Sequence, residues 1–368
     1  PTDNIEAYFN ALKNEELFDA LEENGEPIAF FEYTDLEKEN ILPVLPDYIQ
    51  SSAMQNAAGG IYDIRFDGLW KFICAGNERW VKLVTDRQKE QLTKIGAQGI
   101  YNDVGICSTH PVFCYDDSHT HGTRINTLPE FYNLLETSWK VSRSVKVNAA
   151  GDNGFTGQEM ITEQVIPWVD FYQTRAGAGE MGCMENSAIM NLVKGDVAYK
   201  IPLFEYVYHE YAGVRGDGFI IPVDSVGVPY YATVASIALN GGIPEYNYEC
   251  YNNHVYTGLE KLLNEDMIGF VDTLGEARLS YGKNYLVYGA MARVPSLNLA
   301  RERYTYETPL VNNWTAVGGS KKGSMYVDPV VSSAFTFGGK TAIFLCNITA
   351  NKKSVEFTLN AGSLYGVE

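Results

Sequence analysis

The sequence predicts an α/β protein, in which a barrel of alternating strands and helices is followed by a small antiparallel β-sandwich. Up to about residue 246, six short apolar runs of strand length alternate with helical stretches, as in βαβ units around a parallel sheet. These runs are continuously apolar, which is typical of strands buried on both faces. After about residue 284 the helical pattern ends, and short β-like runs separated by turn residues take its place.

The first part of the chain combines strong helical signals with short strands. Gly25 is a stop signal after the first helical segment, and Pro129 lies where the first turn of the third helix would be. The apolar runs at 27–34 and 99–103 have the length of strands. Apolar residues at helical spacing predict three helices, at 4–23, 78–98 and 127–144.

The alternation continues through the rest of the barrel region. A short helix is predicted around 160–168, a longer one begins at Val228, and a helix at 257–281 closes the region. The predicted domains are therefore a barrel at 1–283 and a β-sandwich at 284–368. Strands are predicted at 154–159, 169–175, 201–211 and 242–246, which brings the count to six.

Charge and composition limit the classes of partner. The chain carries 46 acidic against 28 basic residues, a formal net charge of −18. This balance argues against nucleic acid and anionic membranes, because binding to phosphates requires clustered Lys and Arg, and no run of eighteen apolar residues is present to span a bilayer. The 25 tyrosines, 17 phenylalanines and 5 tryptophans suit a carbohydrate substrate, although a Tyr-rich core would explain them equally well.

The six cysteines are spread widely and form no C-x-x-C pair. We therefore expect free buried thiols, no structural zinc site and no cofactor, with a loop disulfide between Cys107 and Cys114 as an alternative. No signal peptide is visible, and the chain opens at Pro1 without a methionine, so an upstream piece is expected to be missing or removed. An extracellular or cell-surface location is favoured over a cytoplasmic one.

Two carboxylates end consecutive predicted strands. Asp103 ends the strand at 99–103, and Glu159 ends the strand at 154–159. Active sites of α/β barrels lie at the carboxyl ends of the strands, so these two side chains are expected to be neighbours. Cleavage of a glycosidic bond needs such a pair, one ionised and one protonated. The competing interpretation is that each acid caps a helix or anchors a loop.

Further polar residues lie close to these strand ends and are predicted to contact substrate. We call the segment "CYDDSHTHG" at 114–122 the histidine loop, and we expect it to hydrogen bond to sugar hydroxyls. Its residues would also fit a simple polar turn or, with Asp117 included, a metal site. From the sequence we assign none of these residues as a metal ligand. The predicted substrate-binding residues are Tyr101, Asp116, His119, His121, Arg175, His209 and Glu210.

The order of several segments resembles a known family. The segments "CAGNERW", "GIYNDVG", "CYDDSHTHG", "GQEMITEQVIPWVDFY" and "IPLFEYVYHEY" are together similar to large, mostly bacterial glycoside-hydrolase-like proteins of the endo-α-N-acetylgalactosaminidase group. The resemblance covers roughly residues 27–250. It implies a (β/α)8 barrel, with Asp103 as the nucleophile and Glu159 as the acid/base, and with His119, His121 and His209 at the border of the sugar site.

This chain departs from the family's barrel in its number of strands. Only six strands are visible, so the first one or two strands of the (β/α)8 barrel are expected to be absent. An open arc would expose its edges, and another chain or an upstream segment is expected to complete it.

These observations lead to three hypotheses. The first is a retaining glycoside hydrolase that acts on a neutral or amino-sugar glycan. The second is a catalytically inactive barrel that binds glycans or has a structural role in a larger assembly. The third is a metal-dependent hydrolase that uses the histidine loop, and it ranks last.

Overall fold

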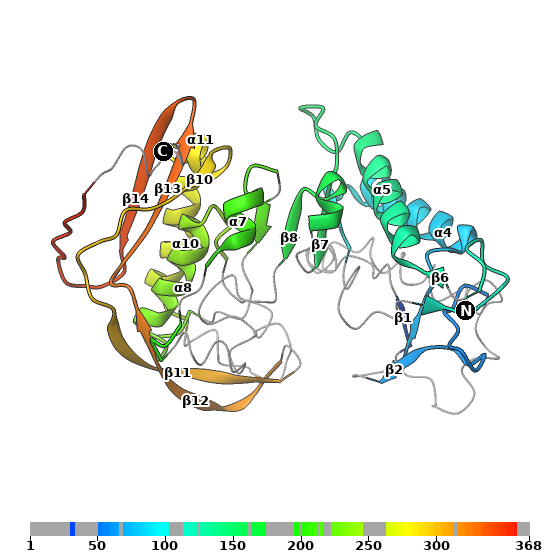
Figure 1. The fold of residues 1–368 in the computed structure, drawn as a ribbon, viewed down its shortest axis with the longest axis horizontal. Helices are drawn as coiled ribbons and strands as arrows, with labels where there is room; N and C mark the ends of the chain where they lie inside the picture. The colour runs from blue at the N-terminus through cyan, green and yellow to red at the C-terminus, as the bar shows by residue number, and fades with distance from the viewer. Residues whose placement is uncertain are drawn as a thin grey trace. The chain divides into compact units, whose positions relative to one another are not determined.

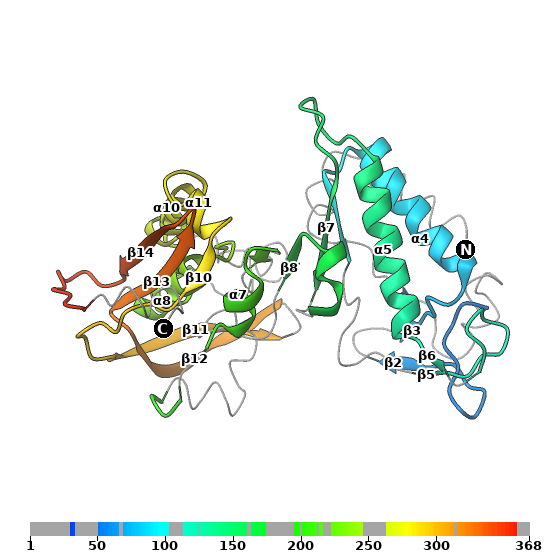
Figure 2. The same cartoon turned by 45° about the horizontal axis from the view of Figure 1, so that its top comes forward.

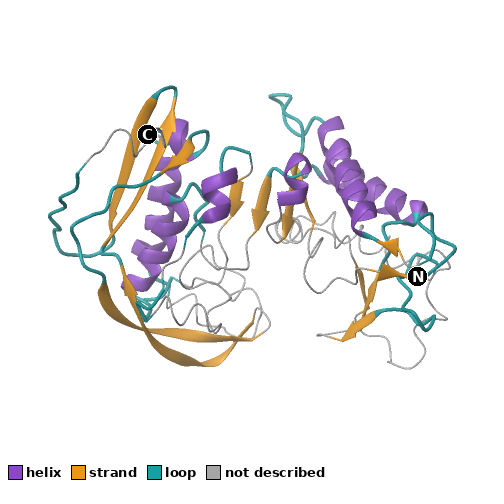
Figure 3. Cartoon of the chain, viewed as in Figure 1, coloured by secondary structure: helices purple, strands orange, loops and turns teal. Residues whose placement is uncertain are grey.

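The structure is a computed structural model, and it describes the chain as two compact units, Pro1–Tyr172 and Gln173–Glu368. Figure 3 shows its helices and strands by colour. The predicted helix at 4–23 lies outside the described residues. The described residues are 30–33, 51–65, 69–102, 113–123, 125–159, 163–173, 195–198, 201–211, 213–215, 222–245, 263–312 and 315–358.

Two long helices of the first unit confirm the sequence prediction. Helix α4 (Glu78–Glu90) begins at Asn77, whose side chain accepts hydrogen bonds from two backbone amides of the first turn. It continues into a π-helical segment (Gln91–Ile95) that ends at Gly96 with a positive φ of 89°. Helix α5 (Leu128–Ser144) has its proline in the first turn, as expected. The two helices lie side by side (Figures 1 and 2).

The same unit contains the parallel strands that the sequence predicts. Strand β4 (Gly99–Asn102) pairs in parallel with β7 (Phe155–Glu159). Strand β8 (Phe171–Gln173) lies next to β7 in the same sheet and follows a 3-10 helix at Glu163–Trp168. Helix α5 packs against β7, so the first βαβ unit is present as predicted.

The N-terminal strands pair differently from the prediction. The run at 27–34 contains β1 (Phe30–Tyr33), which pairs antiparallel with β3 (Leu69–Phe72), and β2 (Asp63–Arg65) pairs antiparallel with the other edge of β3. The expectation that this run is a parallel barrel strand was therefore wrong. The antiparallel pairing of β2 with β3 has a direct cause, because the three residues between these two strands are too few for the crossover that a parallel connection needs. A second antiparallel pair joins β5 (Phe113–Cys114) to β6 (Ile125–Asn126).

The predicted strand at 201–211 is a helix instead. Helix α7 (Leu203–Tyr208) follows Pro202, whose carbonyl accepts a hydrogen bond from the Tyr206 amide at 2.9 Å. A continuous apolar run has neither a helical nor a strand period, so its composition did not distinguish the two. The proline before the run favours the first turn of a helix.

The second unit is built around two helices. Helix α8 (Val228–Leu239) is buried on nearly every side, and it packs against α10 (Glu265–Leu279), which begins at the side-chain cap of Asn264. Both helices were predicted. The core around them also takes in Tyr306, Met325 and Val327 from the C-terminal strands. This unit also contains the short helix α11 (Lys283–Leu286) and strand β9 (Gly213–Arg215).

The C-terminal strands are antiparallel, as predicted. One sheet has the order β10-β13-β14, and a separate long ribbon pairs β11 with β12. The division of the chain falls after Tyr172. The predicted domain boundary at 283, the β-sandwich and the barrel that lacks its first strands stay predictions. The strands are β10 (Ala290–Ala292), β11 (Glu302–Asn312), β12 (Thr315–Val327), β13 (Val330–Phe337) and β14 (Lys340–Asn347).

A membrane-spanning helix is not found among the residues that the structure describes.

One carboxylate fastens the βαβ unit of the first unit. Asp170 accepts a hydrogen bond from the Thr156 amide at 2.8 Å and forms an ion pair with Arg143 from the last turn of α5. Arg143 also donates to the Gly154 carbonyl at 3.1 Å. Asp170 therefore links the start of β8 to both β7 and α5.

We predict that Asp170→Ala lowers the free energy of unfolding by about 1–2 kcal/mol, because it removes a charge-assisted hydrogen bond to a backbone amide and a partly exposed ion pair. Urea denaturation followed by circular dichroism measures the change. Asp86→Ala is the matched control, since Asp86 forms a solvent-exposed ion pair with Lys82, and its loss should cost less than about 0.5 kcal/mol. Equal losses in the two variants would contradict the assigned role of Asp170.

Candidate functional site

The carboxyl ends of β4 and β7 form the candidate active site. The two strands run in register, with Gly99 opposite Phe155 and Asn102 opposite Gln158. One face of this strand pair is buried. On it, Asn102 accepts a hydrogen bond from the Gln88 amide of α4 at 3.0 Å. The strand ends are thus held against the helix layer by buried polar contacts as well as by apolar packing.

The other face of the strand pair carries aromatic rings. The Tyr101 ring stacks on Phe171 with centroids 6.3 Å apart, and Phe155 meets Phe171 edge-on at 5.8 Å. The Phe171 ring occupies the space that a Cβ at Gly157 would need, so only glycine fits there. Phe155 stays 40% exposed. This aromatic face, Tyr101, Phe155 and Phe171, lies along the strands that lead to the two acidic positions.

The structure describes only part of the predicted catalytic set. Glu159 is the last residue of β7. Asp103 follows Asn102 directly in the sequence but lies outside the described residues, as does Arg175. The roles assigned to Asp103, Glu159 and Arg175 stay predictions.

His209 and Glu210 follow α7 in the second unit. The His209 ring is buried, with Nδ1 2.8 Å from the Gly289 carbonyl and Nε2 2.9 Å from the Leu286 carbonyl. It packs on Phe335 with ring centroids 4.9 Å apart. Glu210 is exposed. The contacts of His209 make it a packing residue of this unit, and the predicted contact of both residues with a sugar stays a prediction.

Gly241 is the close neighbour on which the position of His209 depends. Its φ is +85°, and a Cβ there would lie 2.0 Å from His209 Nε2. We predict that Gly241→Ala destabilises the second unit by more than about 2 kcal/mol, because it adds both a clash and backbone strain. Gly269→Ala in α10 is the control, since its Cβ meets open space and should be neutral or slightly stabilising. Thermal unfolding of the two variants checks this, and an unchanged Tm for Gly241→Ala would contradict it.

Three side chains of the histidine loop meet a cysteine that lies forty residues earlier in the sequence. Cys74, Cys114, His119 and His121 each offer one ligand atom, and these four atoms all lie within 4.8 Å of one another. Cys74 Sγ is 3.0 Å from His121 Nε2, and Cys114 Sγ is 3.5 Å from His119 Nδ1. We call this group the Cys/His cluster. Its two cysteines and His119 are buried, and His121 is half-buried.

The remaining ring nitrogens of both histidines face backbone carbonyls. His119 Nε2 lies 2.7 Å from the Ser51 carbonyl, and His121 Nδ1 contacts the Gly122 carbonyl. Asp116 stabilises the loop, because it accepts hydrogen bonds from the Gln55 side chain at 2.6 Å and from the Ser118 amide at 2.8 Å. Both histidine rings are therefore engaged within the protein, and the predicted sugar contacts of Asp116, His119 and His121 stay untested.

Close contact shifts the pKa values of this cluster. A hydrogen bond between the two thiols lowers the pKa of Cys114, while the same contact, with burial, raises the pKa of Cys74. Burial disfavours the charged His119 ring, but its contacts with Cys114 and the Ser51 carbonyl together raise its pKa.

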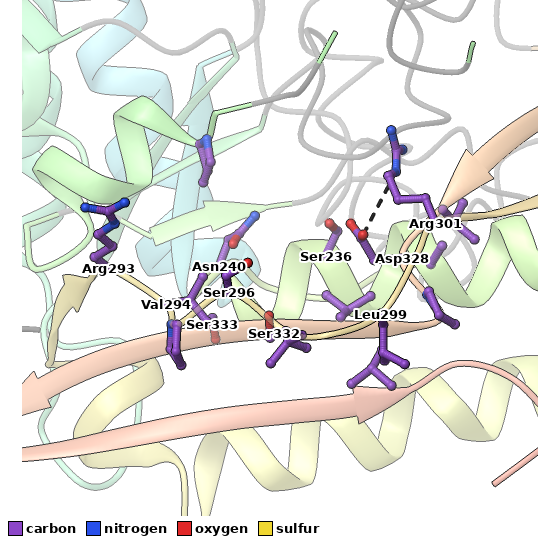
Figure 4. A pocket seen from close by; sticks show the side chains of 18 of the residues that line it. Ser236, Asn240, Arg293, Val294, Ser296, Leu299, Arg301, Asp328, Ser332 and Ser333 are labelled. Atoms are coloured by element: carbon purple, nitrogen blue, oxygen red, sulfur yellow. Dashed lines mark ion pairs between the residues drawn. The ribbon is translucent and has the colours of Figure 1, made fainter. Parts of the chain in front are cut away.

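The second unit contains a separate polar cavity of about 1010 Å³ (Figure 4). It lies between α8, β13 and the segment after β10. The ion pair of Arg301 with Asp328 spans 4.0 Å, and Arg301 also donates to Asp196 at 2.7 Å. None of the described residues that the sequence singled out lines this cavity, and no sequence motif marks it.

Comparison with known proteins gives a family match for part of the chain. Residues 46–219 match the model of a domain of unknown function (DUF6259). No curated protein matches the chain.

Solved structures show a distant likeness. The ligand-free alpha-N-acetylgalactosaminidase NagBb from Bifidobacterium bifidum is 16% identical with a TM-score of 0.44, over 83% of this chain and 38% of that one. The GalNAc complex of the same enzyme is 15% identical to this chain with a TM-score of 0.41, and the match covers 80% of this chain and 39% of that one. A GH31 family sulfoquinovosidase from E. rectale is 11% identical with a TM-score of 0.38, and the match covers 76% of this chain and 47% of that one. The chain thus spans about two fifths of the length of the NagBb structures that it matches.

Proposed function

We propose that this chain is a retaining glycoside hydrolase whose catalytic carboxylates are Asp103 and Glu159. The parallel register of β4 and β7 carries the proposal. Asn102 lies opposite Gln158, and the next residue of each chain segment is an acid. Neighbouring strands are about 4.8 Å apart, which is close to the roughly 5–5.5 Å between the two carboxyl groups of retaining glycosidases.

The aromatic face supports the same proposal. Side chains of a strand alternate between its two faces, so we expect position 103 to share the face of Tyr101 and position 159 to share that of Gly157. The two acids would then border the face of Tyr101, Phe155 and Phe171. Aromatic rings offer apolar faces on which a sugar ring can stack. The net charge of −18 further favours a neutral or amino-sugar substrate over a polyanion.

In this proposal the two carboxyl groups have different roles. The ionised Asp103 attacks the anomeric carbon, while the protonated Glu159 gives its proton to the departing oxygen, and a glycosyl ester on Asp103 results. Glu159, now ionised, removes a proton from a water molecule that attacks the same carbon, and Asp103 leaves as a carboxylate. The assignment of the roles follows the family resemblance of the motifs.

We predict that Asp103→Asn and Glu159→Gln each lower kcat/KM for aryl glycosides by about 10²–10⁴-fold or more, since each removes a group that acts in the transition state. The substrate panel should include aryl N-acetylgalactosaminides and neutral aryl glycosides in both anomeric forms. Release of the aryl alcohol measures turnover. Glu163→Gln is the matched control, because Glu163 is an exposed acid in the 3-10 helix that follows Glu159, and it should retain activity.

The test also separates this function from the glycan-binding alternative. Undiminished hydrolysis in both strand-end variants would rule out the catalytic pair. A chain that turns over none of the panel but retains a glycan on an array, with loss of retention in Tyr101→Ala, would identify a binding protein instead. Circular dichroism of each variant shows whether the fold is intact.

A further inference from the structure

We propose that Cys74, Cys114, His119 and His121 bind one zinc ion as a structural site. Two thiolate sulfurs and two imidazole nitrogens are a donor set that tetrahedral Zn²⁺ favours. With Zn–S near 2.3 Å and Zn–N near 2.0 Å, a tetrahedral ion separates its ligand atoms by roughly 3.3–3.8 Å. The sulfur–nitrogen distances of 3.0 Å for Cys74–His121 and 3.5 Å for Cys114–His119 lie within a few tenths of an ångström of this spacing. All four ligand atoms lie within 4.8 Å of one another, about an ångström above it.

The hydrogen bonds around the cluster orient both rings for binding to a cation. A carbonyl oxygen can only accept, so His119 Nε2 and His121 Nδ1 must carry the protons that face Ser51 and Gly122. The opposite nitrogens, His119 Nδ1 and His121 Nε2, then hold free lone pairs in the neutral rings. These are the two atoms that face the sulfurs. Metal-binding histidines usually donate their second N–H to such an acceptor.

The backbone also makes room for this arrangement. A Cβ at Gly76 would lie 2.2 Å from the His121 ring, so the approach of His121 to Cys74 needs glycine at this position. The Gly76 amide in turn points at Cys74 Sγ at 3.4 Å. Thr120 donates from its hydroxyl to the Gly76 carbonyl at 2.5 Å, which ties the histidine loop to the same turn.

Charge balance favours a divalent cation in the cluster. Two buried thiolates without a counter-charge would be costly to desolvate. Zn²⁺ with two thiolates and two neutral imidazoles has zero net charge. A closed set of four protein ligands leaves no position for a water or substrate, so the site is structural and differs from the open site of a metal-dependent hydrolase.

The ion would join parts of the chain that are distant in sequence. Cys74 lies just before the N-cap of α4, Cys114 lies in β5, and the two histidines lie in the turn that follows. Strand β5 is only two residues long, too short to fix the loop by its ladder alone. Zinc would thus hold the β5–β6 hairpin to the start of α4.

Two other uses of the cluster give different experimental results. A disulfide between Cys74 and Cys114 would remove both thiolates. A reactive Cys114–His119 pair would need access to solvent, whereas both cysteines are fully buried, which argues against it.

The test measures the metal content of the 368-residue chain. The protein is purified, exchanged into buffer with Zn²⁺, freed of unbound metal and analysed by mass spectrometry for metal content. We expect about one zinc per chain. Removal with a strong chelator should lower the Tm by roughly 10 °C, because structural zinc contributes to the free energy of folding. Addition of Zn²⁺ should restore it.

Variants assign the ligands. Cys114→Ser and His119→Gln should each lower the zinc content at least tenfold. Cys346→Ser is the matched control, since Cys346 is a free cysteine of the second unit outside the cluster, and it should keep a full equivalent. Wild-type protein loaded with Co²⁺ after chelation gives a result that does not depend on folding of the variants, because thiolate–Co²⁺ charge transfer and tetrahedral d–d bands report the ligands directly.

Two outcomes would overturn the proposal. One is wild-type protein that takes up less than about a tenth of an equivalent of zinc and shows no thiolate–Co²⁺ band. The other is a Cys74–Cys114 disulfide in freshly purified protein, detected by mass spectrometry of peptides. Because the readouts are metal content, spectra and Tm, they are independent of whether the chain hydrolyses glycosides.

Discussion

The register of two parallel strands is the constraint on which the candidate active site depends. A slip of one residue between β4 and β7 would reverse the faces of every side chain on the strand that moved. Asn102 would leave its contact with Gln88, and Tyr101 would leave the Phe171 ring. The buried polar contact on one face and the aromatic stacking on the other thus specify one register. That register sets Asn102 opposite Gln158, so the proposed catalytic acids follow two residues that lie at the same level of the sheet.

The surroundings of these strands support this register from several directions. Glycine is needed at positions 99 and 157, because the ring of Phe155 fills the space that a Cβ at Gly99 would take and the ring of Phe171 fills that at Gly157. Asp170 holds β7 through the Thr156 amide and holds α5 through Arg143. Gln158 is fully buried beside Asn102, and its side-chain amide has no hydrogen-bond partner among the described residues. A buried amide without a hydrogen-bond partner lowers the free energy of unfolding. Gln158 lies one residue before Glu159, so this unfavourable group is adjacent in sequence to the proposed acid/base.

The Cys/His cluster changes the interpretation of the histidine loop. From the sequence, its acids and histidines suggested contacts with sugar hydroxyls. In the structure the rings face two sulfurs and two carbonyls, and Asp116 accepts hydrogen bonds from Gln55 and Ser118. The predicted sugar contacts of these residues stay untested. A loop that zinc holds in place could still shape a pocket, but it would do so through its backbone and neighbours. The two proposals are therefore compatible, and they concern different residues.

The sequence alone determined the helices α4 and α5, whose apolar residues recur at helical spacing. It also predicted α8, α10, the strands β4, β7 and β8 and the antiparallel C-terminal strands, from the lengths of their apolar runs and the turn residues between them. It also placed Asp103 and Glu159 at the ends of neighbouring strands, because strand ends can be read from local pattern. It could not identify α7, since an apolar run without a period fits a helix or a strand equally. Only the tertiary structure brought Cys74 to Cys114, His119 and His121, because forty residues separate Cys74 from Cys114 and no local pattern marks their contact. The two cysteines meet because the Cys74 amide donates to the Ser52 carbonyl at 2.7 Å and the Tyr115 amide, next to Cys114, donates to the Gln55 carbonyl at 2.9 Å.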